Sequence, residues 1–265
     1  MNPILVTVIG IALIFLCTTL GSAVVFFFHK KEISPKVSEI FMGFASGIML
    51  SASIFSLIVP ALGAEVQYMP SWSIVALSVI GGAGFIWLID KLVPHFHFEG
   101  GEEGLPTEKI NRTGKMFLAV TIHNVPEGLS VGIAYGVALA SWTGNSQAAL
   151  WGALALAIGI GIQNIPEGAV VSLAVKAEEG SSLKGFVFGT LSGAVEPIAA
   201  VLGVFLAMQL QAVMPWALAF AAGCMLYVVA EEMIPEMTKD STHHHGVWSM
   251  ILGFVLMMVL DVTLG

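Results

Sequence analysis

Three glutamates lie inside long apolar stretches of this 265-residue chain, where a carboxylate would be unusual without a function. They are Glu127 in HNVPEG, Glu167 in QNIPEG and Glu196 in SGAVEP. If these stretches cross a membrane, each carboxylate costs at least roughly 2.5–3.5 kcal/mol at the centre of the hydrocarbon layer. The three glutamates therefore predict a shared polar site that compensates this cost.

The first two motifs repeat the pattern N-x-P-E-G at residues 124–128 and 164–168. Side chains at positions i and i+4 of a helix share one face, so His123 lies beside Glu127, and Gln163 lies beside Glu167. Each proline lacks the N–H that would bond a carbonyl one turn earlier. Freed carbonyls are tolerated at membrane depth only where protein or water lines them, so the motifs predict a polar cavity. The glycine of each motif lets a neighbouring helix approach closely.

Imidazole, carboxylate and amide groups that converge at mid-membrane form a credible site for a divalent metal ion. Nitrogen and oxygen ligands suit zinc and its first-row neighbours better than calcium or magnesium. The alternative is a buried hydrogen-bond network that only packs polar helices together, and the repeat of the whole motif makes this interpretation weaker. The candidate metal ligands are His123, Asn124, Glu127, Gln163, Asn164, Glu167 and Glu196.

Weaker candidates lie outside these motifs. Met49 could be a thioether ligand, although a methionine in an apolar helix more often serves packing. Glu231 could assist release at an inner mouth, and Asp261 with Ser56 could line an outer entrance. A solvated acidic face explains Glu231 and its acidic neighbours equally well.

Composition indicates which elements must position these residues. Hydrophobic residues make up 57% of the chain and charged residues 11%, with a mean hydropathy of +0.90, whereas soluble domains carry about 25% charged residues. We therefore expect an all-α polytopic membrane protein that forms a single domain over residues 1–265. Eight segments are long and apolar enough to cross a bilayer, near residues 4–28, 37–59, 72–90, 116–140, 148–175, 183–210, 214–236 and 246–264.

A second repeat indicates how the spans are arranged. The pattern F-A-x-G-x-M-L occurs at residues 44–50 and 220–226, and each copy is followed at a similar distance by a proline, Pro60 or Pro235. Because the two segments would run in opposite directions, they predict an inverted-topology repeat of spans 1–3 and 6–8 around spans 4 and 5, a 3+2+3 arrangement. Chance similarity between apolar segments is the alternative.

The cations determine the predicted orientation. All ten lysines and arginines follow spans 1, 3, 5 or 7, and the positive-inside rule places that side in the cytoplasm. Both termini are then outside, and the long connection 91–115 is cytoplasmic. With a net charge of −8 the chain has no basic surface for nucleic acid. Its predicted partners are divalent metal ions and the lipid bilayer.

The motifs HNVPEG, QNIPEG and SGAVEP resemble those of the ZIP (Zrt/Irt-like) family of divalent metal transporters, and most closely its bacterial GufA-like branch. The likeness extends over essentially the whole chain, including eight spans and a histidine-containing loop between spans 3 and 4. It implies a homodimer in the cell inner membrane. It also implies that spans 1, 4, 5 and 6 move as a unit against the other four.

The resemblance further implies a binuclear site. One position would be formed by His123, Glu127, Gln163 and Glu167, with Met49 approaching from span 2. The second would be formed by Asn124, Asn164 and Glu196, with Glu127 and Glu167 bridging the two positions. Some relatives carry Asp where this chain has Asn164, so the loss of that charge makes the second position weaker or optional here.

The predicted function is transport of zinc into the cytoplasm through this mid-membrane site, with cadmium, iron and manganese as alternative cargoes. The metal is then the cargo, and no cofactor is expected. The alternative is an intramembrane zinc metalloenzyme. Against it, the sequence lacks an H-E-x-x-H motif, whose spare glutamate would act as general base. Hydrolysis also requires an open coordination position with a bound water molecule, and no residue of the sequence is left over for that role.

Overall fold

The structure, a computed structural model, describes residues 2–28, 34–64, 66, 68–96, 102–104, 110–142, 147–209, 213–239 and 243–264. Within these residues, eight helical segments of 20–32 residues are apolar enough to cross a membrane, which confirms the predicted all-α polytopic fold. Their lengths match a hydrocarbon layer of about 30 Å at about 1.5 Å per residue.

Four spans are single helices and four are interrupted. The single helices are α4 (Ser71–Leu92), α5 (Arg112–Ala140), α6 (Ala148–Glu179) and α11 (His245–Leu264). The interrupted spans are α1 (Pro3–Ala23) with the 3₁₀ turn η1 (Val24–Phe26), α2 (Pro35–Ala52) with η2 (Ser53–Ile58) and α3 (Val59–Gly63), α7 (Ser182–Gly193) with α8 (Val195–Gln209), and α9 (Met214–Val228) with η4 (Val229–Met233) and α10 (Ile234–Met237).

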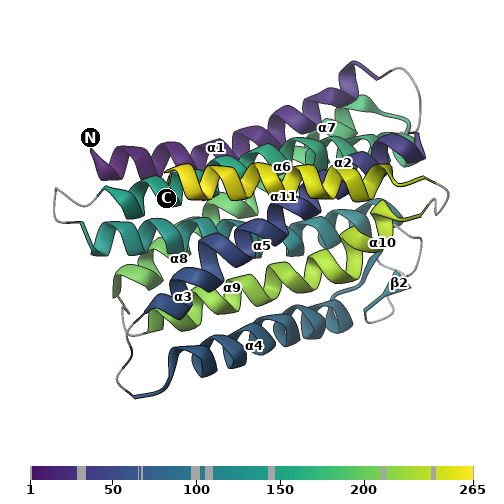
Figure 1. Cartoon of the computed structure of the whole chain (residues 1–265). Helices are drawn as coiled ribbons and strands as arrows, with labels where there is room; N and C mark the ends of the chain where they lie inside the picture. The colour runs from purple at the N-terminus through teal and green to yellow at the C-terminus, as the bar shows by residue number, and fades with distance from the viewer. Residues whose placement is uncertain are drawn as a thin grey trace.

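The connection between α4 and α5 is shorter than predicted, because both helices extend into it. It contains a short antiparallel pair, β1 (His95–Phe96) and β2 (Glu102–Glu103), which no periodicity in the sequence indicates. This pair lies at one end of the bundle, and both chain termini lie at the other (Figure 1). The described cations also flank the end that carries β1 and β2, on Lys36, Lys91, Arg112, Lys115, Lys176, Lys184 and Lys239.

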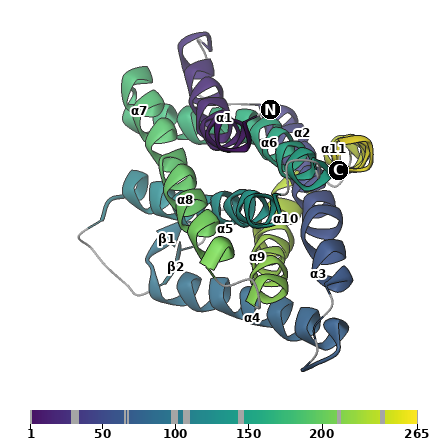
Figure 2. The same cartoon turned by 90° about the vertical axis from the view of Figure 1, so that its left-hand side faces the viewer.

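The helices pack in two groups of four spans. In the first group α1 packs against α6 and α5 packs against α8, and in the second group α2 packs against α11 and α4 against α9. Figure 2 shows α4 and α9 side by side. The groups meet mainly where α2 and α11 contact α6, and where α5 contacts α9. Spans 1, 4, 5 and 6 therefore form one packed unit.

The glycines of the two P-E-G motifs lie at close helix crossings, as predicted. A Cβ atom at Gly128 of α5 would collide with the backbone carbonyl of Glu196 in α8. A Cβ atom at Gly168 of α6 would collide with the backbone carbonyl of Thr18 in α1. The two crossings bring α1 and α8 against the helices that carry Glu127 and Glu167. Both α5 and α6 continue as helices through Pro126 and Pro166.

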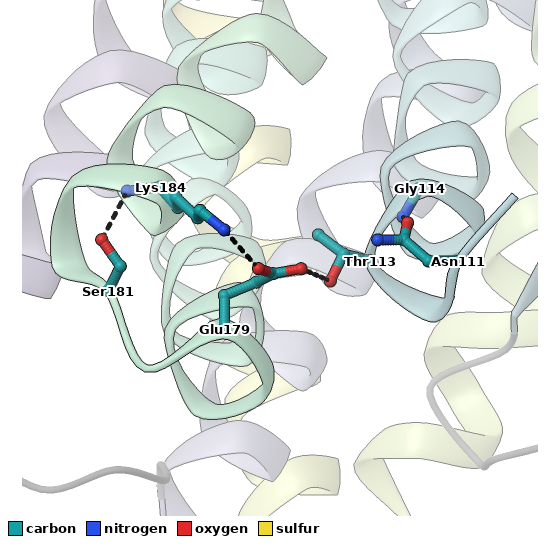
Figure 3. Close-up of polar contacts among 6 residues, drawn as sticks. All are labelled: Asn111, Thr113, Gly114, Glu179, Ser181 and Lys184. Atoms are coloured by element: carbon teal, nitrogen blue, oxygen red, sulfur yellow. Dashed lines mark hydrogen bonds and ion pairs between the residues drawn. The ribbon is translucent and has the colours of Figure 1, made fainter.

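Polar contacts join the first group at the end that carries the cations. The Glu179 carboxylate of α6 accepts a hydrogen bond from Thr113 of α5 at 2.7 Å and lies 2.6 Å from the Lys184 ammonium of α7 (Figure 3). The ammonium of Lys176, also in α6, donates to the carbonyls of Val25 at 3.2 Å and Phe28 at 2.6 Å, beyond the end of α1. One helix, α6, thus holds the ends of the other three spans.

Spans 2 and 7 share an irregularity. Both η2 and η4 are π-helical, both follow a copy of F-A-x-G-x-M-L, and both precede a proline, Pro60 or Pro235. Met49 and Met225, from the two copies, are both buried. Stretches of π-helix are rare and frequently occur at functional sites. These parallels support the predicted inverted repeat, which remains a prediction.

The glycine crossings can be tested away from the glutamates. A Cβ atom at Gly253 of α11 would collide with the Phe44 carbonyl of α2. We expect Gly253→Val to destabilise the protein by about 1–3 kcal/mol, because a backbone carbonyl cannot rotate away. The thermal unfolding midpoint in detergent should fall by several degrees. Gly84→Val is the matched control, since a Cβ atom there meets nothing within 4 Å. Equal midpoints for the two variants would contradict this account of the packing.

Candidate metal-binding site

A small cavity of about 20 Å³ lies where the two helix groups meet. This volume is about that of one water-sized probe, so it can hold a single small ion or water molecule. His123 and Glu127 line it from α5, Glu167 from α6 and Met49 from α2. The structure thus brings together four of the residues singled out in the sequence. The remaining lining residues are Met42, Val120, Val228, Glu232 and Met233.

A close polar contact at this cavity joins His123 to Glu232. The Nε2 atom of His123 lies 2.9 Å from Oε1 of Glu232, and both side chains are less than 10% exposed. Glu232 belongs to the π-helical segment η4, so the contact crosses from the first helix group to the second. The adjacent Glu231, which the sequence analysis selected, is exposed. The carboxylate that reaches the cavity is therefore that of Glu232.

Several buried oxygens of the candidate ligands have no hydrogen-bond partner among the described residues. They are both carboxylate oxygens of Glu127, Oε1 of Gln163 and Oδ1 of Asn124. Gln163 is fully buried on the same face of α6 as Glu167. A buried acceptor without a donor is costly, so these oxygens favour a cation as their partner. The donor set of imidazole, carboxylate, amide and thioether suits a transition metal such as zinc.

The second predicted set is already linked by hydrogen bonds. The Glu196 carboxylate accepts from Thr18 at 2.9 Å and from the Asn164 amide at 2.7 Å. The amide nitrogen of Asn124 donates to the Ser192 carbonyl at 3.0 Å. Glu196 lies in the first turn of α8, just after the interruption at residue 194. Acidic side chains are favoured there because the helix dipole is positive at that end.

The two sets do not form a closed metal cage in this conformation. Within the described residues, no three His, Cys, Asp or Glu side chains converge tightly enough to hold a metal ion. The His123 imidazole contacts Glu232 in this conformation. A metal ion bound through Nε2 of His123 would have to displace this contact or bind both side chains.

A larger cavity of about 340 Å³ lies at the end of the bundle that carries the termini. Asp261 of α11 and Ser56 of η2 line it, and the Ser56 hydroxyl donates to Asp261 Oδ1 at 3.0 Å. The second carboxylate oxygen, Oδ2, is buried and has no hydrogen-bond partner in the described part of the chain. The remaining lining is mostly apolar. Asp261 and Ser56 thus line one cavity together, and the outer entrance at these residues stays a prediction.

Sequence reasoning missed three kinds of residue at the site. Glu232 lies in an acidic stretch next to Glu231, and its spacing does not indicate that it lines the cavity. Met42 and Met233 add thioethers to the cavity, but buried methionines in apolar helices look like packing residues. Thr18 is a lone threonine in an apolar span, and its contact with Glu196 arises only in the folded bundle.

Comparison with known proteins identifies the family. The family described as ZIP Zinc transporter matches residues 110–261. The chain is 36% identical to the zinc transporter GufA of Myxococcus xanthus over 89% of this chain and 90% of that protein. It is 33% identical to the zinc transporter ZIP11 of Xenopus tropicalis, over 100% and 98%, and 32% identical to the zinc transporter ZIPB of Bordetella bronchiseptica, over 97% and 81%. With its eight membrane-length helices, this multi-pass membrane protein belongs to the ZIP zinc transporter family.

Proposed function

We propose that this protein transports zinc across a membrane through the small cavity between its two helix groups. The observation that carries the proposal is the cavity itself, which has room for one ion and is lined by His123, Glu127 and Glu167 in the middle of apolar helices. The related proteins GufA, ZIP11 and ZIPB are named zinc transporters. The family is one of transporters, which removes the metalloenzyme alternative.

The proposed zinc ligands are His123, Glu127, Gln163 and Glu167, with Met49 at the edge of the cavity. Two carboxylates neutralise the charge of a divalent cation, and the neutral imidazole and amide complete its coordination without adding charge. The unpartnered oxygens of Glu127 and Gln163 support this assignment. Zinc is cargo in this proposal, and cadmium, iron and manganese are the competitors against which selectivity should be measured.

The two cavities suggest a route. We place the entrance at Asp261 and Ser56, whose cavity opens at the end that carries the termini. The ion would pass to Glu127 and Glu167 and leave past Glu232, which lies nearer the end that carries the cations. Because Glu232 already contacts His123, it can accept the ion as the imidazole releases it. The positive-inside rule makes that end cytoplasmic, so the proposed direction is inward.

The cellular setting is also a proposal. The positive-inside argument places both termini outside, and relatives in bacteria favour the cell inner membrane. The mutual packing of all eight spans and relatives that align with up to the full chain favour one transport domain over residues 1–265. The homodimer expected from the family resemblance can be tested by cross-linking in native membranes.

The ligand assignment predicts a loss of transport. In liposomes, His123→Ala or Glu127→Ala should abolish most zinc uptake, because each change removes one of the four proposed zinc ligands. Glu178→Gln is the matched carboxylate control, since Glu178 is exposed and pairs with Arg112 outside the cavity. Uptake at the wild-type rate in a correctly inserted His123→Ala variant would refute the site.

The exit assignment predicts a difference between two adjacent glutamates. Glu232→Gln should slow zinc uptake about tenfold or more, because the carboxylate that faces His123 is lost. Glu231→Gln should leave the rate nearly unchanged, because Glu231 is exposed. The measurement is initial zinc uptake in liposomes at equal protein content. A larger effect at residue 231 than at residue 232 would exclude the proposed exit.

The orientation predicts which ends of the helices are accessible in cells. In a variant without Cys17 and Cys224, cysteine at Ser141 or Gln147 should react with an impermeant maleimide added outside. Cysteine at Glu178 or Lys184 should react only after the membrane is opened. All four positions are exposed, so burial does not limit labelling. The opposite labelling pattern would reverse the proposed topology and the direction of transport.

A further inference from the structure

Each oxygen of the Glu196 carboxylate accepts a hydrogen bond from a side chain of the protein itself. The Thr18 hydroxyl of α1 donates to Oε1 at 2.9 Å, and the Asn164 amide of α6 donates to Oε2 at 2.7 Å. The same amide nitrogen also lies 3.0 Å from the Thr18 hydroxyl. All three side chains are at most 2% exposed. Three spans, 1, 5 and 6, therefore meet in one buried polar cluster, which we call the Thr18 clasp.

The orientation of the Asn164 amide follows from its neighbours. Its nitrogen lies 2.7 Å from a carboxylate oxygen of Glu196 and 3.3 Å from the Ile14 carbonyl. Both of these atoms accept hydrogen bonds, so the NH₂ group must face them. The amide oxygen is then left on the side of Gln163, whose amide nitrogen lies 3.5 Å away. Asn164 therefore presents a donor, and not a metal-binding oxygen, to Glu196.

The clasp differs from the neighbouring residues in how its oxygens are used. Both carboxylate oxygens of Glu127 and the amide oxygen of Gln163 are buried without a hydrogen-bond partner in the described part of the chain. Both oxygens of Glu196 have one. A cation would relieve the first set, whereas at Glu196 it would compete with two hydrogen bonds, one of them from an amide NH₂ group that only donates.

Close packing holds Thr18 at this place. A Cβ atom at Gly193 would collide with the Thr18 side chain, and one at Gly168 would collide with its carbonyl oxygen. Thr18 is thus enclosed by α6 on one side and by the end of α7 on the other. Its hydroxyl also lies 3.2 Å from the Ile14 carbonyl, one turn earlier in α1. Few side chains would fit this space and still donate to Glu196.

We propose that Thr18 is a positioning residue for the transport site, and that Thr18 and Asn164 together replace a second metal ion as the partner of Glu196. Glu196 then anchors spans 1, 5 and 6 to one another, and the chain binds zinc only at the first position. This inference rests on the proposed function for the location of that first position. The clasp itself rests on hydrogen bonds that exist without zinc.

The metal-binding part is tested by counting zinc ions on purified protein. Wild type and Thr18→Ser should each retain about one zinc per chain after equilibration and gel filtration, because serine keeps the hydroxyl donor. Asn164→Asp should retain about two, since the new carboxylate replaces the donor with a second acidic ligand beside Glu196. The zinc content is measured by elemental analysis. Two zinc ions on wild type, with one lost in Glu196→Gln, would overturn the inference.

The anchoring part is tested without zinc by a double-mutant cycle on thermal stability in detergent with chelator present. Thr18→Val keeps the shape of the side chain and removes the hydroxyl, so we expect the unfolding midpoint to fall by about 5 °C. In the Glu196→Ala background the same change should have a clearly smaller effect, because the Glu196 acceptor is absent and only the contacts of Thr18 with Asn164 and the Ile14 carbonyl remain. Additive effects of the two substitutions would show that Thr18 does not hold Glu196.

The two experiments separate this inference from the proposed function. If wild-type liposomes show no zinc uptake, the proposed function fails, and the double-mutant cycle still decides whether the clasp exists. If the wild type takes up zinc, His123→Ala does not, and Asn164→Asp binds no additional zinc, the proposed function stands. In that case the inference that Thr18 and Asn164 replace a second metal ion is wrong.

Discussion

The structure depends on the cost of burying polar groups where water cannot replace their hydrogen bonds. Glu127, Asn164 and Glu196 are at most 1% exposed, and each lies near the middle of its span. At that depth a carboxylate is tolerated only when donors or a cation replace its hydration. The glycine crossings follow from this constraint, because donors on one helix must come within hydrogen-bond distance of acceptors on the next. Polarity in the middle of the membrane therefore determines how closely the helices pack.

The same constraint explains why the polar contacts follow the two helix groups. Thr18, Asn164 and Glu196 link spans 1, 5 and 6, and Glu179 links spans 4, 5 and 6 at the end that carries the cations. In the second group, Ser56 donates to Asp261 and Ser249 donates to the Ile40 carbonyl. Each of these contacts thus lies within one helix group.

Much of this fold could be predicted from sequence because the bilayer imposes simple rules. Apolar length predicted all eight spans to within a few residues, and the i, i+4 spacing placed His123 and Glu127 on one face. Glu232 could not be predicted, because the spacing does not show which of two adjacent glutamates in the irregular segment η4 is buried. Thr18 could not be predicted either, since its role depends on a residue 178 positions away in the chain. Sequence periodicity describes faces of single helices, whereas these two residues depend on how helices meet.

The location of the cavity at the boundary between the groups gives it a mechanical consequence. Glu127 and Glu167 belong to the first group, whereas Met49 and Glu232 belong to the second. A zinc ion held by Glu127 and Glu167 would travel with the first group, and its distance to Glu232 would change as the groups shift. The His123 contact to Glu232 spans this boundary, so a shift must break it or carry it along. A zinc ion that arrives at this boundary would interact with the buried Glu232 carboxylate and offset its charge. We propose that a shift between the groups is coupled to the position of the ion through this pair of side chains.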